Sequence, residues 1–362
     1  MSKCIYCLAD TNTLEHALPA AFGEFTNSPN LESRLCADCN SRCLGLLDQQ
    51  LSRCGPEGFL REYYGVEGRP KHAKINPFAR GSAGGRRLDF STVDRNFGAE
   101  VNLEIVNGVT RQICELIFIE IASGKPHHLP LREGMTAAQV REGMTRLRII
   151  EPFETRASFY PTEQEWVQKL IREVCPTVTF SEIKSLSNII ETPIVKFELG
   201  ERYYRAFAKI GFHYFLTQFT MYTGHEEMFA RIREFIYVDT KEPIRRVNEF
   251  MNERQLPLLV NMLNPDVVPN GWRAHILAAE TKPGVCLAHV QMFLTEEWAR
   301  VGPIYTIILA KDVPVTQHNN FAHLYQYFPD GKKGRFSGEA KPLPSMRTDI
   351  VLPRSKPVIP VD

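Results

Sequence analysis

The feature that most constrains how this chain can fold is a pair of Cys-x2-Cys motifs near the N-terminus, Cys4–Cys7 and Cys36–Cys39, separated by 28 residues. Two thiolate pairs on two tight turns can surround a metal ion tetrahedrally, and sulfur ligands in that geometry suit zinc. A redox dithiol of the thioredoxin type would need one such pair at a strand–helix turn. The chain has nine cysteines, an odd number that makes a poor disulfide framework. The sequence therefore predicts structural zinc bound by these four cysteines in a reducing compartment.

The composition is ordinary for a globular protein with a hydrophobic core, because 43% of the 362 residues are apolar and 23% are charged. The length fits two or three domains. The net charge of +1 is nearly neutral, so any surface that binds nucleic acid must be a local patch. No apolar run reaches the roughly 20 residues of a membrane span, and the start MSKCIYC does not resemble a signal peptide. We therefore expect a cytoplasmic protein without a membrane partner.

Periodicity and composition divide the chain into four expected segments of an α+β protein. Residues 1–55 form a small metal-bound unit, in which a hairpin with Asp10–Asn12 at its tip precedes a helix over 38–51. Residues 56–95 are a connector rich in glycine, proline and basic residues. Residues 96–330 form a larger α+β domain with strands at 99–106 and 115–122, a helical hairpin over 201–237 and an antiparallel sheet over 273–311. Residues 331–362 are an extended tail rich in proline and basic residues.

The insert between the two cysteine pairs carries side chains that a purely structural zinc site does not need. Glu15 and His16 are adjacent at the end of an expected strand, and Asn40 follows the last cysteine on the expected helix. A neutral imidazole can take a proton from water near neutral pH, and carboxylate and amide oxygens suit Mg²⁺ or Mn²⁺. Taken one at a time, Glu15 is more simply explained as a surface charge, His16 as a hydrogen-bonded histidine and Asn40 as a helix cap. Their combination between two cysteine pairs favours a hard-cation site beside a general base.

The pattern C-x2-C…EH-x2-P…NL…C-x2-CN, which runs from Cys4 to about Asp48, resembles the HNH endonuclease superfamily in its variant with two zinc knuckles. The resemblance implies a zinc-bound ββα-metal domain ahead of the larger α+β domain. It implies that Glu15 and Asn40 hold a catalytic divalent cation and that His16 is the general base. It also implies that Asn30 fixes the loop between the two strands of the motif.

Two positions depart from the commonest form of this family. Asn40 stands where the last histidine of the family name is often found, which bears on metal preference more than on activity. Gly23–Glu24 stands where many relatives have two glycines, which bears on the loop geometry and on the approach of a phosphate. In the implied mechanism His16 deprotonates an in-line water while Mg²⁺ or Mn²⁺ stabilises the leaving oxygen of a DNA phosphodiester.

Basic residues near the cysteine pairs are candidates for DNA contact. From Pro56 to Phe90 the chain has seven Lys or Arg against four acids, and a solvated linker explains this excess as well as a phosphate-contacting strip does. Outside this region, adjacent His127 and His128 are not expected to share a metal, because neighbouring residues of a strand point to opposite sides. The candidate DNA-binding residues are Arg42, Lys71, Lys74, Arg86 and Arg87.

The leading hypothesis is therefore a metal-dependent HNH endonuclease or nickase that acts on DNA, with structural zinc and catalytic Mg²⁺ or Mn²⁺. A role in defence against phage and self-association through the C-terminal domain remain open. One alternative is a zinc-knuckle DNA-binding protein in which the Glu15–His16 pair is incidental. Another is an interaction protein whose C-terminal domain is the working part.

Overall fold

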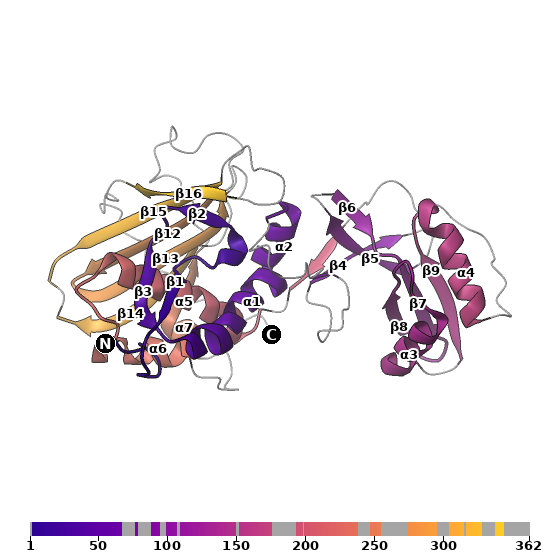
Figure 1. The fold of residues 1–362 in the computed structure, drawn as a ribbon, viewed down its shortest axis with the longest axis horizontal. Helices are drawn as coiled ribbons and strands as arrows, with labels where there is room; N and C mark the ends of the chain where they lie inside the picture. Colours follow the sequence, from indigo (N-terminus) through magenta and orange to yellow (C-terminus); the bar gives the residue numbers. More distant parts are fainter. Residues whose placement is uncertain are drawn as a thin grey trace. The chain divides into compact units, whose positions relative to one another are not determined.

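In this computed structural model the described residues are 2–66, 77–78, 88–94, 99–106, 109–149, 152–175, 193–197, 199–237, 247–254, 274–294, 304–314, 316–327 and 337–343. Contacts between Cα atoms divide the chain into two compact units, whose elements are labelled in Figure 1. The first unit combines Met1–Gln50 and Glu67–Pro70 with Leu199–Asp362. The second combines Leu51–Val66 with Lys71–Glu198. Both ends of the sequence therefore belong to the first unit, and the middle forms the second.

The first unit is built on a seven-stranded sheet with the order β11-β14-β13-β12-β15-β16-β2. Neighbouring strands are antiparallel, except that β16 and β2 run parallel. Strands β12 to β14 confirm the antiparallel sheet expected over 273–311. The bounds are β2 Glu24–Thr26, β11 Met251–Arg254, β12 Ala274–Lys282, β13 Gly284–Leu294, β14 Ile304–Val313, β15 Asn319–Tyr327 and β16 Ser337–Leu343.

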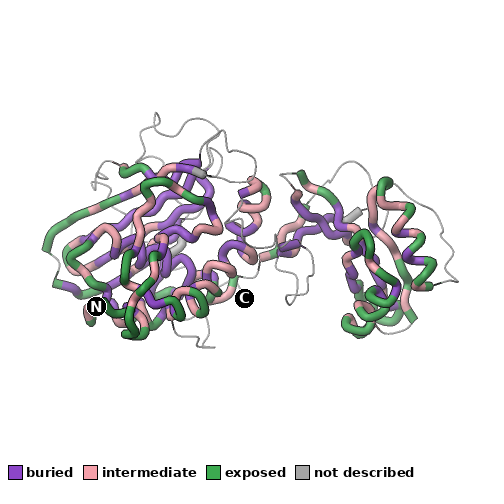
Figure 2. The backbone as a smooth tube through the Cα atoms, viewed as in Figure 1, coloured by how far each residue is buried: buried purple, intermediate pink, exposed green. Residues whose placement is uncertain are grey.

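Helix α5 (Glu201–Gln218) packs against β12, β13 and β14 and is buried along most of its length. Figure 2 shows this burial continuing from the helix into the strands beside it. Gly211 allows the close approach, since a Cβ there would lie 3.0 Å from side-chain atoms of Ala288 and Ile307. A 3-10 turn (Glu227–Phe229) and helix α6 (Ala230–Tyr237) return along α5 and confirm the helical hairpin, and the short helix α7 (Val247–Phe250) also contacts α5. The aromatic face of α5 is thus core.

The cysteine-bearing segment consists of two paired strands and a helix. Strands β1 (Thr13–His16) and β3 (Asn30–Leu35) are antiparallel, and β3 packs on α5. A π-helical turn (Cys39–Leu44) leads directly into α1 (Gly45–Cys54), which confirms a helix beginning at the second cysteine pair. The hairpin expected around Asp10–Asn12 is wrong, because β1 pairs with β3 and the chain between them carries a 3-10 turn (Ala20–Phe22) and β2 to the large sheet.

The second unit contains two smaller antiparallel sheets, with the orders β10-β4-β5-β6 and β8-β7-β9. Strands β5 and β7 confirm the strands expected near 99–106 and 115–122. Helices α3 and α4 contribute to a core with β7 and β8, while a second core gathers around Phe78, Leu88 and Phe90. The bounds are α2 Pro56–Tyr63, β4 Asp89–Asp94, β5 Ala99–Val106, β6 Val109–Gln112, β7 Glu115–Glu120, β8 Pro126–Pro130, α3 Ala137–Leu147, β9 Phe153–Ser158, α4 Gln164–Val174 and β10 Ile194–Lys196.

The two units do not coincide with the four consecutive segments expected from the sequence. Residues 1–50 join 199–362 because β2 extends the large sheet beside β16, a pairing between segments about three hundred positions apart. The expected connector 56–95 includes α2 and β4, and the expected tail 331–362 includes β16, while residues 344–362 lie outside the described residues. Within the described parts of the chain, no helix combines the length and the apolar character that crossing a membrane requires.

Candidate functional site

The four N-terminal cysteines converge as the sequence predicts. The sulfur atoms of Cys4, Cys7, Cys36 and Cys39 all lie within 4.8 Å of one another, and the Cys7 and Cys36 sulfurs are 3.5 Å apart. The Cys39 backbone N–H donates to the Cys36 sulfur at 3.4 Å. Burial opposes ionisation of Cys36, but this N–H and the neighbouring sulfurs lower its pKa to about 7. Four sulfur donors in this arrangement can bind a metal such as zinc, because thiolates are its preferred structural ligands.

The first cysteine turn is fastened to the core of the same unit by aromatic and polar contacts. Tyr6, between the two cysteines of that turn, places its hydroxyl 3.0 Å from His213 Nε2 on α5. The Tyr6 ring also stacks on Tyr237 of α6, with ring centroids 5.4 Å apart. The Tyr237 hydroxyl lies 3.4 Å from the Cys39 sulfur. The four clustered cysteines therefore hold their places partly through helices that lie about two hundred residues away in the sequence.

Glu15 and Asn40, the two expected ligands of a divalent cation, lie together. Glu15 projects from β1 into the interior, where its pKa is lowered in part by the side chain of Asn40, at the start of the helical segment after the second cysteine pair. The Glu15 carboxylate has a further partner that the sequence analysis missed. Lys209 of α5 donates to Glu15 Oε1 at 2.6 Å and to both carboxylate oxygens of Asp48 at 2.8 Å. A lysine ammonium thus sits on the carboxylate proposed to bind a metal.

The charges of this cluster follow from burial and from the ion pairs. Burial opposes ionisation of Glu15, yet Lys209 and the Asn40 side chain keep the pKa of Glu15 below its usual value. Burial likewise opposes the charge on Lys209, but Asp48 and Glu15 raise the pKa of Lys209 above its usual value. His213, one helical turn after Lys209, has its pKa lowered to about 3 by burial and by the Lys209 charge. At neutral pH the cluster therefore holds charged Glu15 and Lys209 beside a neutral imidazole.

His16 and Asn30 lie at the end of the β1–β3 ladder, where they are partners in register. His16 is half-buried, and no hydrogen bond or ion pair holds it within the described residues. The Asn30 Oδ1 atom is buried without a hydrogen-bond partner in that part of the chain. The register thus places His16 beside Asn30, whereas the Glu15 side chain points into the interior; no described contact joins the His16 side chain to Glu15 or Asn40.

The remaining site candidates are outside this cluster. Arg42 is exposed and its guanidinium pairs with Asp38 at 2.9 Å on the same helical turn. Lys71, Lys74, Arg86 and Arg87 lie outside the described residues. The sequence signal that could have pointed to Lys209 is a lysine in the middle of a helical stretch rich in aromatic and aliphatic residues, RAFAKIGFHYF, since a buried lysine is rare unless it is paired.

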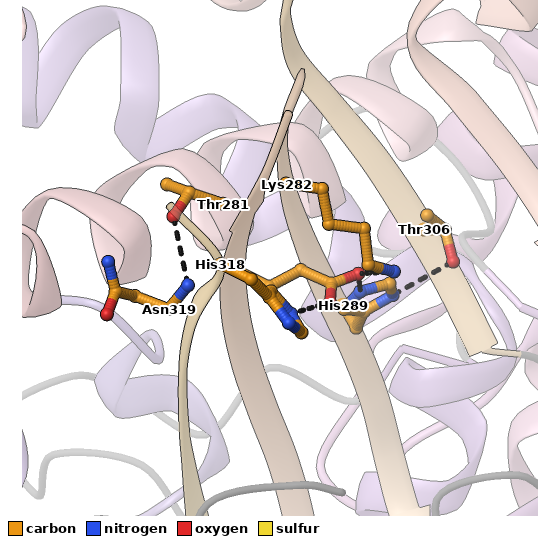
Figure 3. Close-up of polar contacts among 7 residues, drawn as sticks. Thr281, Lys282, His289, Thr306, His318 and Asn319 are labelled. Carbon is orange, nitrogen blue, oxygen red and sulfur yellow. Dashed lines mark hydrogen bonds and ion pairs between the residues drawn. The ribbon is translucent and has the colours of Figure 1, made fainter. Parts of the chain in front are cut away.

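A second polar cluster lies on the large sheet, around Glu280 of β12 (Figure 3). Glu280 Oε1 lies 2.8 Å from Lys282 Nζ and 3.1 Å from His289 Nε2, while Oε2 lies 3.4 Å from His318 Nε2. The other ring nitrogen of His289 is 3.0 Å from Thr306 Oγ1. Burial opposes ionisation of Glu280, but His289 and Lys282 lower its pKa to about 2. His289 and His318 contact different oxygens of the Glu280 carboxylate. These side chains therefore surround the carboxylate and do not form a set of ligands around one cation.

Compared with protein-family models, curated proteins and solved structures, the chain has no significant match. The chemistry of its site therefore has to be argued from its own residues.

Proposed function

We propose that this protein is a metal-dependent endonuclease of the HNH type that hydrolyses phosphodiester bonds in DNA. The observation that carries the proposal is that Asn40, on the helical segment after the second cysteine pair, lies near enough to Glu15 of β1 to lower its pKa. Two antiparallel strands, a following helix and four clustered cysteines supply the arrangement that a ββα-metal unit needs. A carboxylate and an amide oxygen are hard ligands, so they fit Mg²⁺ or Mn²⁺ better than a second zinc ion.

The proposed roles divide among four residues. Glu15 and Asn40 would hold the divalent cation, which when bound supplies positive charge against the developing charge on a phosphate. His16 would accept the proton of the attacking water, since a neutral imidazole is a competent base near pH 7. Asn30 is the register partner of His16 and has a buried oxygen without a hydrogen-bond partner among the described residues, so it would orient the imidazole by accepting its other ring N–H.

The decisive experiment is cleavage of supercoiled plasmid by the full chain with added Mg²⁺ or Mn²⁺. We expect His16→Ala to lower the cleavage rate by at least a hundredfold, because general-base catalysis contributes about 10²–10⁴-fold. His318→Ala, which removes an exposed histidine whose ring contacts Glu280 on the large sheet, is the matched control and should cleave like the wild type. Zinc content and melting temperature should be unchanged in both variants. Equal cleavage by His16→Ala and wild type would refute the role of His16.

The ion pair between Lys209 and Glu15 favours a second candidate, a zinc-stabilised DNA-binding module without catalysis. In that case Glu15 is a partner of a buried lysine and has no metal to hold. A mobility shift on DNA that is unaffected by Mg²⁺, without cleavage at any Mn²⁺ concentration, would support this candidate over the nuclease.

A further inference from the structure

Lys209 is an unusual residue to find in the core of the first unit. Its side chain is fully buried, whereas those of Glu15 and Asp48 are 11% and 24% exposed. An ammonium has three N–H donors, and three carboxylate oxygens surround this one at 2.6, 2.8 and 2.8 Å. The hydrogen-bonding capacity of Lys209 is therefore fully used by the two carboxylates. Such complete pairing is what makes a buried lysine tolerable.

The position of this ammonium coincides with the expected position of a divalent cation. Glu15 is shared, because its Oε1 pairs with Lys209 while Asn40, the second expected ligand, also lowers its pKa. Mg²⁺ binds carboxylate oxygens at about 2.1 Å, so an ion on Glu15 would lie within a few ångströms of the Lys209 nitrogen. Two cations at so short a distance in a buried site repel each other strongly, since little water screens them. Lys209 and a divalent ion bound at Glu15 therefore weaken each other's binding.

Asp48 can keep the Lys209 ammonium paired when a metal ion binds Glu15. It binds the ammonium through both oxygens and comes from helix α1, eight residues after Asn40. A small shift of the Lys209 side chain toward Asp48 would release Glu15 without leaving a bare charge in the core. The net charge of Glu15, Asp48 and Lys209 is −1, so the cluster still attracts a cation while Lys209 is present.

On the basis of the proposed nuclease function, we infer that Lys209 is a resident cation that competes with the divalent metal ion for Glu15. The lysine thereby lowers the metal affinity of the centre and keeps Glu15 ordered when no metal is bound. Metal binding is coupled to the release of Lys209 from Glu15, and the metal concentration at which the centre fills is set by that ion pair.

The test compares variants of the full-length, zinc-loaded chain by Mn²⁺ titration, with free Mn²⁺ measured by electron paramagnetic resonance. The main variant is Lys209→Met with Asp48→Asn, which removes one positive and one negative charge and leaves the net charge of the cluster at −1. We expect it to bind Mn²⁺ at least tenfold more tightly than the wild type. Its melting temperature should also rise with Mn²⁺ more than that of the wild type. Adding Glu15→Gln to this variant should abolish the gain.

The Mn²⁺ affinities test the competition between Lys209 and the metal ion independently of the nuclease proposal. Equal Mn²⁺ affinity of the charge-matched variant and the wild type, within twofold, would overturn the competition. A gain in affinity that survives Glu15→Gln would also overturn it, since the ion would then bind elsewhere. Plasmid cleavage by the wild type bears on the nuclease function alone, so a protein that cleaves but shows no Lys209 effect keeps its function and loses this inference. The single variant Asp48→Asn should bind Mn²⁺ more weakly than the wild type, because Lys209 then rests on Glu15 alone.

Discussion

Acid should destabilise the first unit, and a defined part of the effect should come from the buried His275. This residue lies on β12 with no exposed surface, and both of its ring nitrogens are engaged. The backbone N–H of Phe293 donates to Nδ1 at 3.0 Å, so Nδ1 carries no proton. Nε2 must then carry it and donate to the Tyr327 hydroxyl at 2.6 Å, and that hydroxyl donates to the Phe22 carbonyl. The folded protein therefore requires a neutral imidazole at this position.

The size of the effect follows from the pKa of His275 in the folded and unfolded chains. Burial lowers the pKa from an ordinary value of 6.5 to about 3. Because the folded-state pKa is the lower one, the stability gained from the neutral form is complete above pH 6.5 and declines as the pH falls toward 3. One pKa unit corresponds to about 1.4 kcal/mol, so at pH 5 the loss from this residue is about 2 kcal/mol. This is a large share of the roughly 5–15 kcal/mol that stabilises a typical domain.

The assay is urea unfolding at pH 7 and pH 5, followed by the hydrogen-exchange protection of peptides from β12 and β13. The fall in stability between the two pH values should be about 2 kcal/mol smaller in His275→Gln than in the wild type, since glutamine does not titrate. Comparing the two proteins cancels the effect of acid on the cysteine site. In addition, the imidazole resonances of His275 should still report a neutral ring at pH 5. A His275 that titrates near pH 6.5, or an equal fall in both proteins, would refute the reasoning.

Three further predictions concern other parts of the first unit. Cys36→Ser should reduce bound zinc, measured by atomic emission, and lower the melting temperature, whereas full zinc content with unchanged melting would contradict the four-cysteine site. Glu280→Gln should lower the free energy of unfolding by about 1–2 kcal/mol at pH 7. Because the pKa of Glu280 is lower in the folded protein than in the unfolded chain, this difference from wild type should vanish as the pH falls from about 4.5 to 2. A pH-independent difference in urea unfolding would count against the prediction. Gly338→Ala should destabilise the unit by about 2–4 kcal/mol, since a Cβ there would lie 2.2 Å from the Gln326 carbonyl oxygen; wild-type thermal melting would show that the strands can adjust.

Features written in short stretches of sequence could be predicted. The alternation of AEVNLEIV corresponds to β5 residue for residue, because one face of a strand repeats every second position. The two Cys-x2-Cys motifs predicted the convergence of four sulfur atoms, since cysteine pairs at this spacing are typical of structural zinc sites. The proximity of Glu15 and Asn40 follows from the same local arrangement, as both lie within the segment that the cysteines close.

Features that depend on long-range pairing could not be predicted. The parallel pair β2–β16 joins Glu24–Thr26 to Ser337–Leu343, and three residues of strand carry too little pattern to reveal such a partner. Lys209 was missed for the same reason. Helical periodicity placed it correctly on a helix, but which of its neighbours would face β1 depends on how α5 packs, and that is decided by contacts such as Gly211 against Ala288.

The cysteine-bearing segment cannot be understood as an independent module attached to a larger domain. The buried charge of Glu15 is neutralised by Lys209 from α5, and the Phe22 carbonyl accepts a hydrogen bond from the Tyr327 hydroxyl of β15. Separating the segment would remove both Glu15 and Asp48 from Lys209 and would expose the apolar surface that β3 buries against α5. The cysteine site closes the segment locally, and the second, longer-range set of contacts holds Glu15. A change in the packing of α5 would therefore alter the ion pair between Lys209 and Glu15. For this physical reason we expect substitutions in α5 to affect the proposed metal site.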